Sequence, residues 1–273
     1  MENEKLFSMN DKQFFSKDDL IEKLKEIKKI GWIKTQRPGN DGAVGNTLED
    51  LLGITENNLP IPNAAEWELK SQRKSTSSLT TLFHLEPSPQ AAQIVSKILL
   101  PKYGWKHKEA GKKYPVEEKS FRSTTSATNY TDRGFKIVID RKSEKVKFSF
   151  DPEKIDGNRH VEWISDLKEN FLIKEFEIEP YWGFKDLMYK AGTKLKNAFY
   201  VLAENKYIEK DEFFYFSDVY ILREFSFDNF LKCIEEGYIL IDYDARTGHN
   251  HGTKFRIKQN MWPKLYKNVE KVI

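Results

Sequence analysis

The segment from Glu66 to Ser71 constrains the possible folds of the chain most, because charged and apolar residues alternate along it. A period of two predicts a strand with Glu68 and Lys70 on one face and Leu69 pointing into a core. A carboxylate suits a divalent cation, the Leu69 carbonyl is a further oxygen ligand, and an ammonium group can offset charge on a phosphate. Without its context, an exposed ion pair at this spacing is the commoner explanation.

The order of predicted elements indicates an α+β fold, since helices dominate early and strands later, without regular βαβ alternation. Helical spacing, capping residues and strand-type runs predict these elements. The predicted helices cover 17–30, 46–52, 88–100, 161–170 and 226–236, and the predicted strands cover 66–71, 79–85, 135–140, 146–150, 196–203, 213–222, 239–243 and 253–257. We expect two lobes: residues 1–100, with later returning segments, and residues 101–273.

Composition narrows the class of protein without naming it. Aromatic residues make up 14% of the 273 residues, which favours a packed globular protein over a disordered one. The 45 Lys and Arg residues against 42 Asp and Glu leave a net charge of +3, so a basic groove would have to come from clustering. Cys233 is the only cysteine, which excludes an intrachain disulfide and favours a buried structural thiol. No apolar run reaches membrane-spanning length, and the polar N-terminus has no signal-peptide core, so we expect a soluble cytoplasmic protein.

Two polar segments are candidates for contacts with phosphates. Residues 102–115 form a basic loop that contains aromatic residues, and residues 122–133 are rich in hydroxyl and amide groups between Arg122 and Arg133. Both segments suit a nucleic-acid backbone, and both equally suit a solvated surface loop. The tripeptide His249-Asn250-His251 carries no metal prediction, because no third ligand lies near it in sequence.

Several separated motifs together carry a family resemblance. They are Gly42-Ala-Val-Gly45-Asn-Thr-Leu-Glu49, the loop 56–60, Pro62-Asn63, Glu68-Leu69-Lys70-Ser71, Leu79-Thr-Thr-Leu-Phe83, and the block Arg246 to Arg256. With these motifs the chain resembles the MvaI/BcnI restriction endonuclease family of PD-(D/E)xK nucleases, with MutH as a more distant relative. The resemblance is strong over about residues 37–90 and looser over about 225–260. The combined spacing of the motifs is specific, although no single motif is.

The resemblance implies a PD-(D/E)xK restriction-endonuclease-like core with a second DNA-recognition lobe. It implies a type II site-specific deoxyribonuclease that cuts double-stranded DNA at a short pseudo-palindromic site. Such an enzyme would act as a monomer, with no obligatory protein partner. Mg²⁺ would be the cofactor, and Ca²⁺ would bind in its place without supporting catalysis. The implied catalytic quartet is Glu49, position 63, Glu68 and Lys70, and the implied metal ligands are position 63, Glu68 and Leu69.

Asn63 departs from this pattern, because the family places an aspartate there. An asparagine keeps an oxygen ligand and loses the charge, so metal affinity should fall. Two explanations are open: a natural asparagine compensated by Glu66 or Asp50, or an engineered substitution that holds a DNA complex uncut. The intact remainder of the quartet favours the second.

The C-terminal block is the candidate DNA reader. The resemblance places Arg246, His249, His251, Lys254 and Arg256 in the major groove, where arginine can donate two hydrogen bonds to guanine. The alternative for each residue is a solvated charge at a polar hairpin tip. Two other functions stay open for the whole chain, namely a MutH-like nicking enzyme of mismatch repair and a catalytically silent DNA-binding module.

Overall fold

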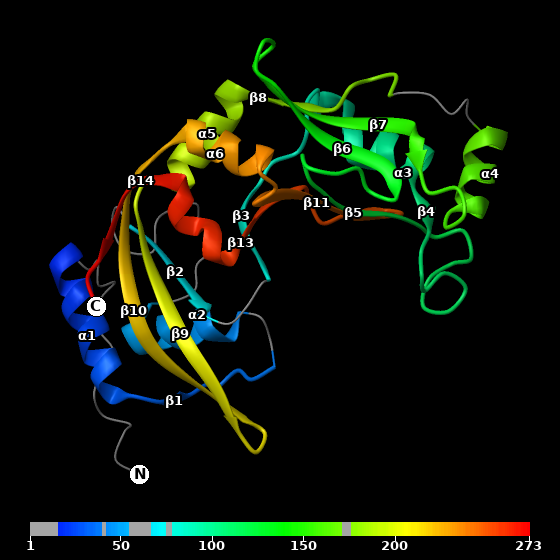
Figure 1. The fold of residues 1–273 in the computed structure, drawn as a ribbon. Coiled ribbons are helices and arrows are strands. Elements are labelled where there is room, and N and C mark those ends of the chain that lie inside the picture. The colour runs from blue at the N-terminus through cyan, green and yellow to red at the C-terminus, as the bar shows by residue number, and fades with distance from the viewer. Residues whose placement is uncertain (1–15, 40–41, 55–66, 75–77, 171–175) are drawn as a thin grey trace. The chain divides into compact units, whose positions relative to one another are not determined.

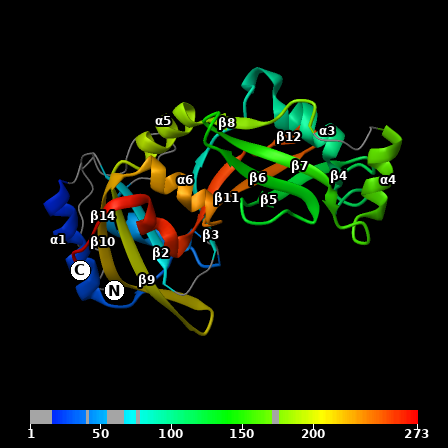
Figure 2. The ribbon, with the colours of Figure 1, turned by 45° about the horizontal axis from the view of Figure 1, so that its top comes forward.

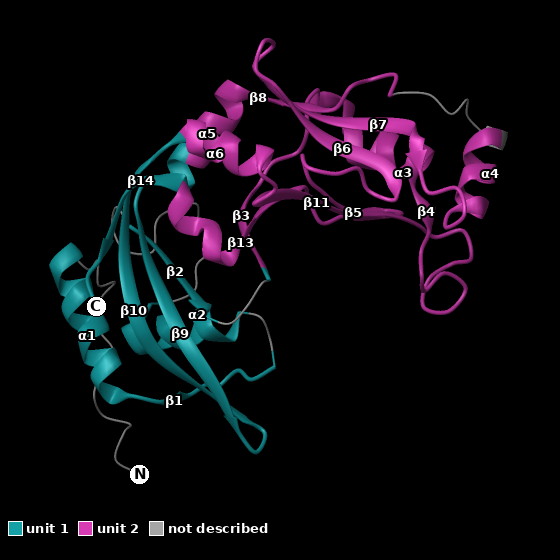
Figure 3. Ribbon diagram, in the orientation of Figure 1, with its two compact units in different colours: residues 1–78, 192–226, 265–273 teal, residues 79–191, 227–264 magenta. Residues whose placement is uncertain are grey.

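The computed structural model describes residues 16–39, 42–54, 67–74, 78–170 and 176–273. The chain divides into two compact units, which Figure 3 colours separately: residues 1–78, 192–226 and 265–273, and residues 79–191 and 227–264. Helices and strands occur in both units, so the expected α+β class is confirmed. The assignment of catalysis to residues 1–100 and of recognition to residues 101–273 stays a prediction.

The first unit is built on one mixed sheet. Its elements are α1 (Lys17–Ile30), β1 (Ile33–Lys34), α2 (Ala43–Leu52), β2 (Glu68–Arg73), β9 (Ala198–Ile208), β10 (Asp211–Phe225) and β14 (Tyr266–Lys271). The strand order is β1-β10-β9-β2, and β14 also pairs with β10 (Figure 1). β2 runs parallel to β9, whereas the other pairings are antiparallel.

One face of this sheet is covered by α1 and α2, and α2 lies behind β9 and β10 in the view of Figure 1. The predicted helix 17–30 is confirmed. Ser16 and Asp19 form a reciprocal capping box at its start, and its apolar stripe is buried. Helix α2 begins three residues earlier than predicted and ends at Gly53, whose φ of 67° suits glycine. The two helices and Leu69 share a core with β9 and β10.

The second unit contains two sheets. Its strands are β3 (Leu79–His84), β4 (Trp105–Lys106), β5 (Lys119–Thr125), β6 (Arg133–Asp140), β7 (Lys145–Ile155), β8 (Tyr181–Gly183), β11 (Ile239–Arg246), β12 (His249–Asn250) and β13 (Lys254–Lys258). The larger sheet has the order β3-β13-β11-β5-β4, with β12 on β11, and the smaller has the order β6-β7-β8. Figure 2 shows β5 and β11 side by side. Both predicted hairpins, β6–β7 and β11–β13, are confirmed.

Aromatic side chains join the two sheets of this unit. Phe121 of β5 packs on Phe135 of β6 with ring centroids 5.4 Å apart, and Tyr243 of β11 packs on Phe148 of β7 at 4.7 Å. All four rings are buried. Contacts of this kind add to the hydrophobic stabilisation that burial of large rings provides. The larger sheet therefore turns one face to the core and leaves the other to polar residues.

The remaining helices are short. They are η1 (Gln90–Ala92), η2 (Val95–Leu99), α3 (Leu100–Tyr103), α4 (Val161–Asn170), α5 (Phe184–Lys194), α6 (Phe227–Glu235) and η3 (Gln259–Leu265). The prediction that a helix ends before Pro101 is wrong, because helical backbone continues through it. Pro101 lies in the first turn of α3, where a proline needs no N–H partner. The sequence did not predict α5, β5, β14 and η3, nor the short strands β1, β4, β8 and β12.

Cys233 is buried in α6, and burial raises the pKa of its thiol to about 11. The predicted structural thiol is thus confirmed, because such a group carries little thiolate at neutral pH. Within the part of the chain that the structure describes, no helix combines the length and apolar character needed to cross a membrane.

Candidate functional site

Glu68 and Lys70 form an ion pair near the start of β2, with Lys70 Nζ 2.7 Å from Glu68 Oε1. Their side chains are 16% and 29% exposed, so both reach the surface from a partly buried position. Leu69 between them is buried in the core with α2. The predicted alternation along β2 is therefore confirmed, and it brings the two charged groups together on the sheet face opposite α1 and α2.

The backbone of β2 offers an oxygen beside this pair. The amide of Glu68 donates to the carbonyl of Asn197, just before β9, and that of Lys74 to the carbonyl of Ala203 in β9. The backbone N–H and C=O groups of the even-numbered residues of β2 therefore point to β9. By strand alternation the Leu69 carbonyl points to the other edge of β2. Among the described residues, no strand pairs with that edge. The Leu69 carbonyl thus points away from β9.

Glu49 lies on α2, which packs against β2. Gly45, one turn earlier on the same helix face, lies so close to Ser71 of β2 that an added Cβ would be 3.7 Å from its hydroxyl oxygen. Glu49 is half-buried on this helix. Asn63 and Glu66 lie outside the described residues. Asp50, the other proposed compensating group, is exposed and pairs with Arg37 at 3.3 Å.

The oxygen donors at this edge fit the chemistry of a hard divalent cation. Glu68 supplies a carboxylate and Leu69 a carbonyl, which are the ligand types that Mg²⁺ accepts. In the described ranges, no three His, Cys, Asp or Glu side chains gather into a metal-binding group. The described residues thus offer two oxygen donors of the right kind, and a magnesium site that includes position 63 stays a prediction.

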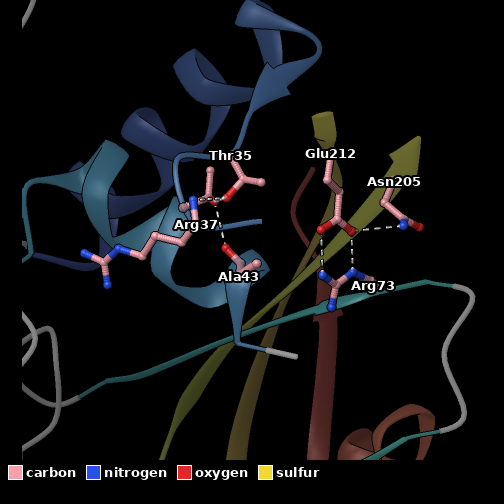
Figure 4. A network of polar contacts seen from close by, with 7 residues as sticks. Thr35, Arg37, Ala43, Arg73, Asn205 and Glu212 are labelled. Carbon is pink, nitrogen blue, oxygen red and sulfur yellow. Dashed lines mark hydrogen bonds and ion pairs between the residues drawn. The ribbon is translucent and has the colours of Figure 1, made fainter. Parts of the chain in front are cut away.

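A buried ion pair fixes the far end of β2 (Figure 4). Arg73 donates from Nε and Nη2 to the two carboxylate oxygens of Glu212 on β10, at 2.9 and 3.1 Å. Asn205 of β9 donates to the same carboxylate at 3.2 Å. Although burial raises the pKa of Glu212, the hydrogen bonds from Arg73 lower it overall. The strand that carries Glu68 and Lys70 is thus tied through side chains to β9 and, beyond it, to β10.

In the second unit, four predicted DNA-binding residues lie on the polar face of the larger sheet. Burial alternates along β11, and the residues that pair with its outward positions face the same way. These outward residues are Arg246 on β11, Lys254 and Arg256 on β13, and Arg122 on β5. The structure therefore gathers cations from three strands, although Arg122 and Arg246 are far apart in sequence.

Two carboxylates on β11 hold three of these cations. Asp244 lies 2.8 Å from Nε of Arg122 and 3.5 Å from Nζ of Lys254. Asp242 lies 3.3 Å from Nη1 of Arg256 and accepts a hydrogen bond from Thr124. Neither aspartate was predicted from the sequence, although the alternation Asp242-x-Asp244-x-Arg246 was a signal that they share a face with Arg246. A carboxylate so placed orients the cations and can itself accept from cytosine N4.

Arg246, the fourth cation of this face, and the three remaining predicted residues have different surroundings. Arg246 pairs with Glu118 at 3.2 Å and stacks over Tyr114 at 4.7 Å, which ties it to the basic loop 102–115. His249 and His251 are exposed at the hairpin tip, with ring centroids 4.2 Å apart. Arg133 belongs to the smaller sheet and stacks on Trp105 at 4.0 Å. The structure thus sets Arg133 among different neighbours from the other four cations.

The chain is thus an α+β protein with an acid–lysine pair on a strand and a cation-bearing sheet face. The family model for the MvaI/BcnI restriction endonuclease family matches residues 21–266, and the chain belongs to this family. Comparison with curated proteins gives no match.

Two solved structures of the restriction endonuclease MvaI are similar to this chain. The complex of MvaI with its cognate DNA substrate is 26% identical, has a TM-score of 0.70, and covers 95% of this chain and 100% of its own. MvaI in the absence of DNA is 25% identical, has a TM-score of 0.56, and covers 97% of this chain and 100% of its own. The similarity therefore extends over nearly the whole of both chains.

Proposed function

We propose that this protein is a magnesium-dependent type II endonuclease that cuts both strands of double-stranded DNA at a short pseudo-palindromic site, as a monomer. The observation that carries the proposal is the ion pair between Glu68 and Lys70 on β2, which sets a carboxylate and an ammonium group side by side. Membership of the restriction endonuclease family supports it. The solved complex of MvaI with DNA supports double-stranded DNA as the substrate.

At the proposed catalytic site, some residues would bind the metal ion and Lys70 would act on the water and the phosphate. Glu68, the Leu69 carbonyl and position 63 would hold the cation. Glu49 is the fourth member of the quartet that the family resemblance implies, and from α2 it would have to reach the cation around the edge of β2. A bound Mg²⁺ acidifies water and withdraws charge from a phosphoryl oxygen. Lys70 would orient the attacking water and offset the negative charge that develops on the phosphate. The Arg73–Glu212 pair would keep the strand in register while these groups act.

Recognition is assigned to the polar face of the larger sheet. Asp242 and Asp244 orient Arg256, Arg122 and Lys254 before DNA arrives, which lowers the entropic cost of ordering long side chains on binding. Arg246 is held on one side by Glu118, so its remaining N–H groups can donate to a guanine edge. The exposed His249 and His251 would reach bases from the hairpin tip.

A second candidate function follows from Asn63, because an asparagine in place of an aspartate removes a negative charge from the proposed metal site. The protein would then be a DNA-binding module that does not cut. Digestion of a mixed-sequence plasmid by the protein and by its Asn63→Asp variant, with mapping of the ends, separates the candidates. We expect fragments with one common end sequence from Asn63→Asp in Mg²⁺. Binding without cleavage by both proteins would favour the silent module, and cleavage of one strand alone would favour a MutH-like nicking enzyme.

A further inference from the structure

A cavity of about 790 Å³ lies within the second unit, and its lining includes none of Arg122, Arg246, Lys254 and Arg256. Its wall comes from β4, from the start of β6 and from the beginning of α4, so it is formed by residues 105–166 alone. Cavities of this volume are in the range that small ligands occupy. Glu68 and Lys70 do not line it either.

Arg133 lines this cavity, and its positive charge is only partly balanced by nearby negative charge. Its side chain is only 20% exposed. The guanidinium stacks on Trp105 at 4.0 Å and also lies over Trp163 at 5.5 Å. Its Nε is buried and has no hydrogen-bond acceptor among the described residues, and the nearest carboxylate, Asp132, is 3.7 Å from Nη1. Burial lowers the pKa of Arg133, the change expected of a cation that has too little negative charge around it.

Asp132 cannot compensate Arg133 fully, because it is shared. Its other oxygen lies 3.0 Å from Nη1 of Arg159 and 3.1 Å from Nε2 of His160, a side chain that is nine-tenths buried and whose Nε2 makes no hydrogen bond in the described structure. One carboxylate thus faces two guanidinium groups and an imidazole. A further anion at this point would relieve the imbalance, since buried cations are stable when paired.

The rest of the cavity wall carries one more cation and two carboxylates, all exposed, so the case for an anion rests on the partly buried Arg133. Lys106 adds a third cation, and the wall includes Val161, where α4 begins and where the helix carries partial positive charge. The carboxylates in the wall, Glu162 and Asp166, are both on α4 and exposed. The volume exceeds what a lone phosphate needs, so the ligand should carry a group about the size of a nucleoside.

We propose that this cavity binds the phosphoryl group of a nucleotide, either free or at the 5′ end of a DNA strand. Arg133 and Arg159 would donate to the phosphate oxygens, and the sugar and base would fill the remaining volume. The proposal does not depend on DNA cleavage, because a nucleotide can be bound without any reaction.

The test is calorimetric titration of the full-length protein, without divalent cations, with dAMP, inorganic phosphate and deoxyadenosine. We expect dAMP to bind at least about tenfold more tightly than deoxyadenosine. Arg133→Gln should abolish the binding. Arg159→Ala should weaken it about tenfold, and this variant should fold because the Arg159 side chain is 69% exposed. Arg141→Ala is the matched control, because that arginine pairs with Asp228 and Glu235 elsewhere in the same unit.

The outcomes decide the proposal and the source of the ligand. Equal binding of dAMP and deoxyadenosine, no binding of dAMP, or equal losses in Arg159→Ala and Arg141→Ala would overturn it. Inorganic phosphate that binds as tightly as dAMP would overturn the nucleotide part. If a 5′-phosphorylated duplex binds more tightly than the same duplex with a 5′-hydroxyl group, the ligand is the 5′ end of a DNA strand. If only dAMP binds, the ligand is a free nucleotide. If Arg133→Gln loses its near-ultraviolet circular dichroism, the affinity of Arg159→Ala for dAMP alone decides between these outcomes.

Discussion

Replacement of Glu212 by alanine should destabilise the first unit, because it takes the Glu212 carboxylate away from the largely buried Arg73. The Glu212 side chain is fully buried, that of Arg73 is 17% exposed, and three hydrogen bonds converge on the carboxylate. Removal of one partner from a buried pair costs about 3–5 kcal/mol. Since water can reach part of the guanidinium, we expect a loss at the lower end of this range, about 3 kcal/mol.

The assay is urea unfolding followed by the fluorescence of tryptophan, because Trp67 packs on Phe199 beside β2. The double variant Arg73→Met/Glu212→Leu should recover most of the loss, since apolar replacements of a buried pair are often neutral. A Glu212→Ala loss below about 1 kcal/mol would show that the pair does not anchor β2. A double variant as unstable as the sum of its single changes would refute the reasoning about an uncompensated charge.

Three further results are expected. Although burial raises the pKa of Asp218, hydrogen bonds from Lys271 and Lys74 lower it to about 2. The ionised carboxylate should therefore stabilise the fold fully above pH 3.8, its ordinary pKa, and this stabilisation should be lost as the pH falls towards 2. Acid unfolding of the Asp218→Asn variant should lack this loss. DNA affinity should fall steeply with salt, with a log–log slope of about −0.9 per phosphate contact, and a flat plot would exclude a phosphate-tracking role for residues 102–115. Arg246→Ala should weaken binding of the cognate site by about 1–3 kcal/mol and reduce discrimination at one base pair. Equal weakening on random duplexes would instead make Arg246 a residue that positions the DNA.

Most of the correct sequence-based predictions came from patterns within single helices and strands. The capping residues of α1 and the alternation along β2 are encoded within a few residues of each element, so helix 17–30 and the shared face of Glu68 and Lys70 followed directly. The end of a helix at Pro101 was predicted wrongly, because the effect of a proline depends on which turn of a helix contains it.

Long-range pairings were beyond local reasoning. Arg73 and Glu212 are 139 residues apart, and neither has a neighbour that signals the other. Asp244 joins Arg122 to Lys254 only because β5 and β13 flank β11. The roles of position 63 and of the reading residues stay predictions that rest on family resemblance and on this geometry.

Single-turnover cleavage in Mg²⁺ tests the central claim most directly. The substrates are plasmids that contain the mapped site, and the enzymes are Asn63→Asp and Asn63→Asp/Lys70→Ala. We predict that Asn63→Asp cuts both strands and that the added Lys70→Ala change slows cutting by at least about a hundredfold, as loss of one charge-stabilising group does, with DNA affinity nearly unchanged. Equal cutting rates for the two proteins would contradict the assignment of Lys70 and, with it, the catalytic role of the pair on β2.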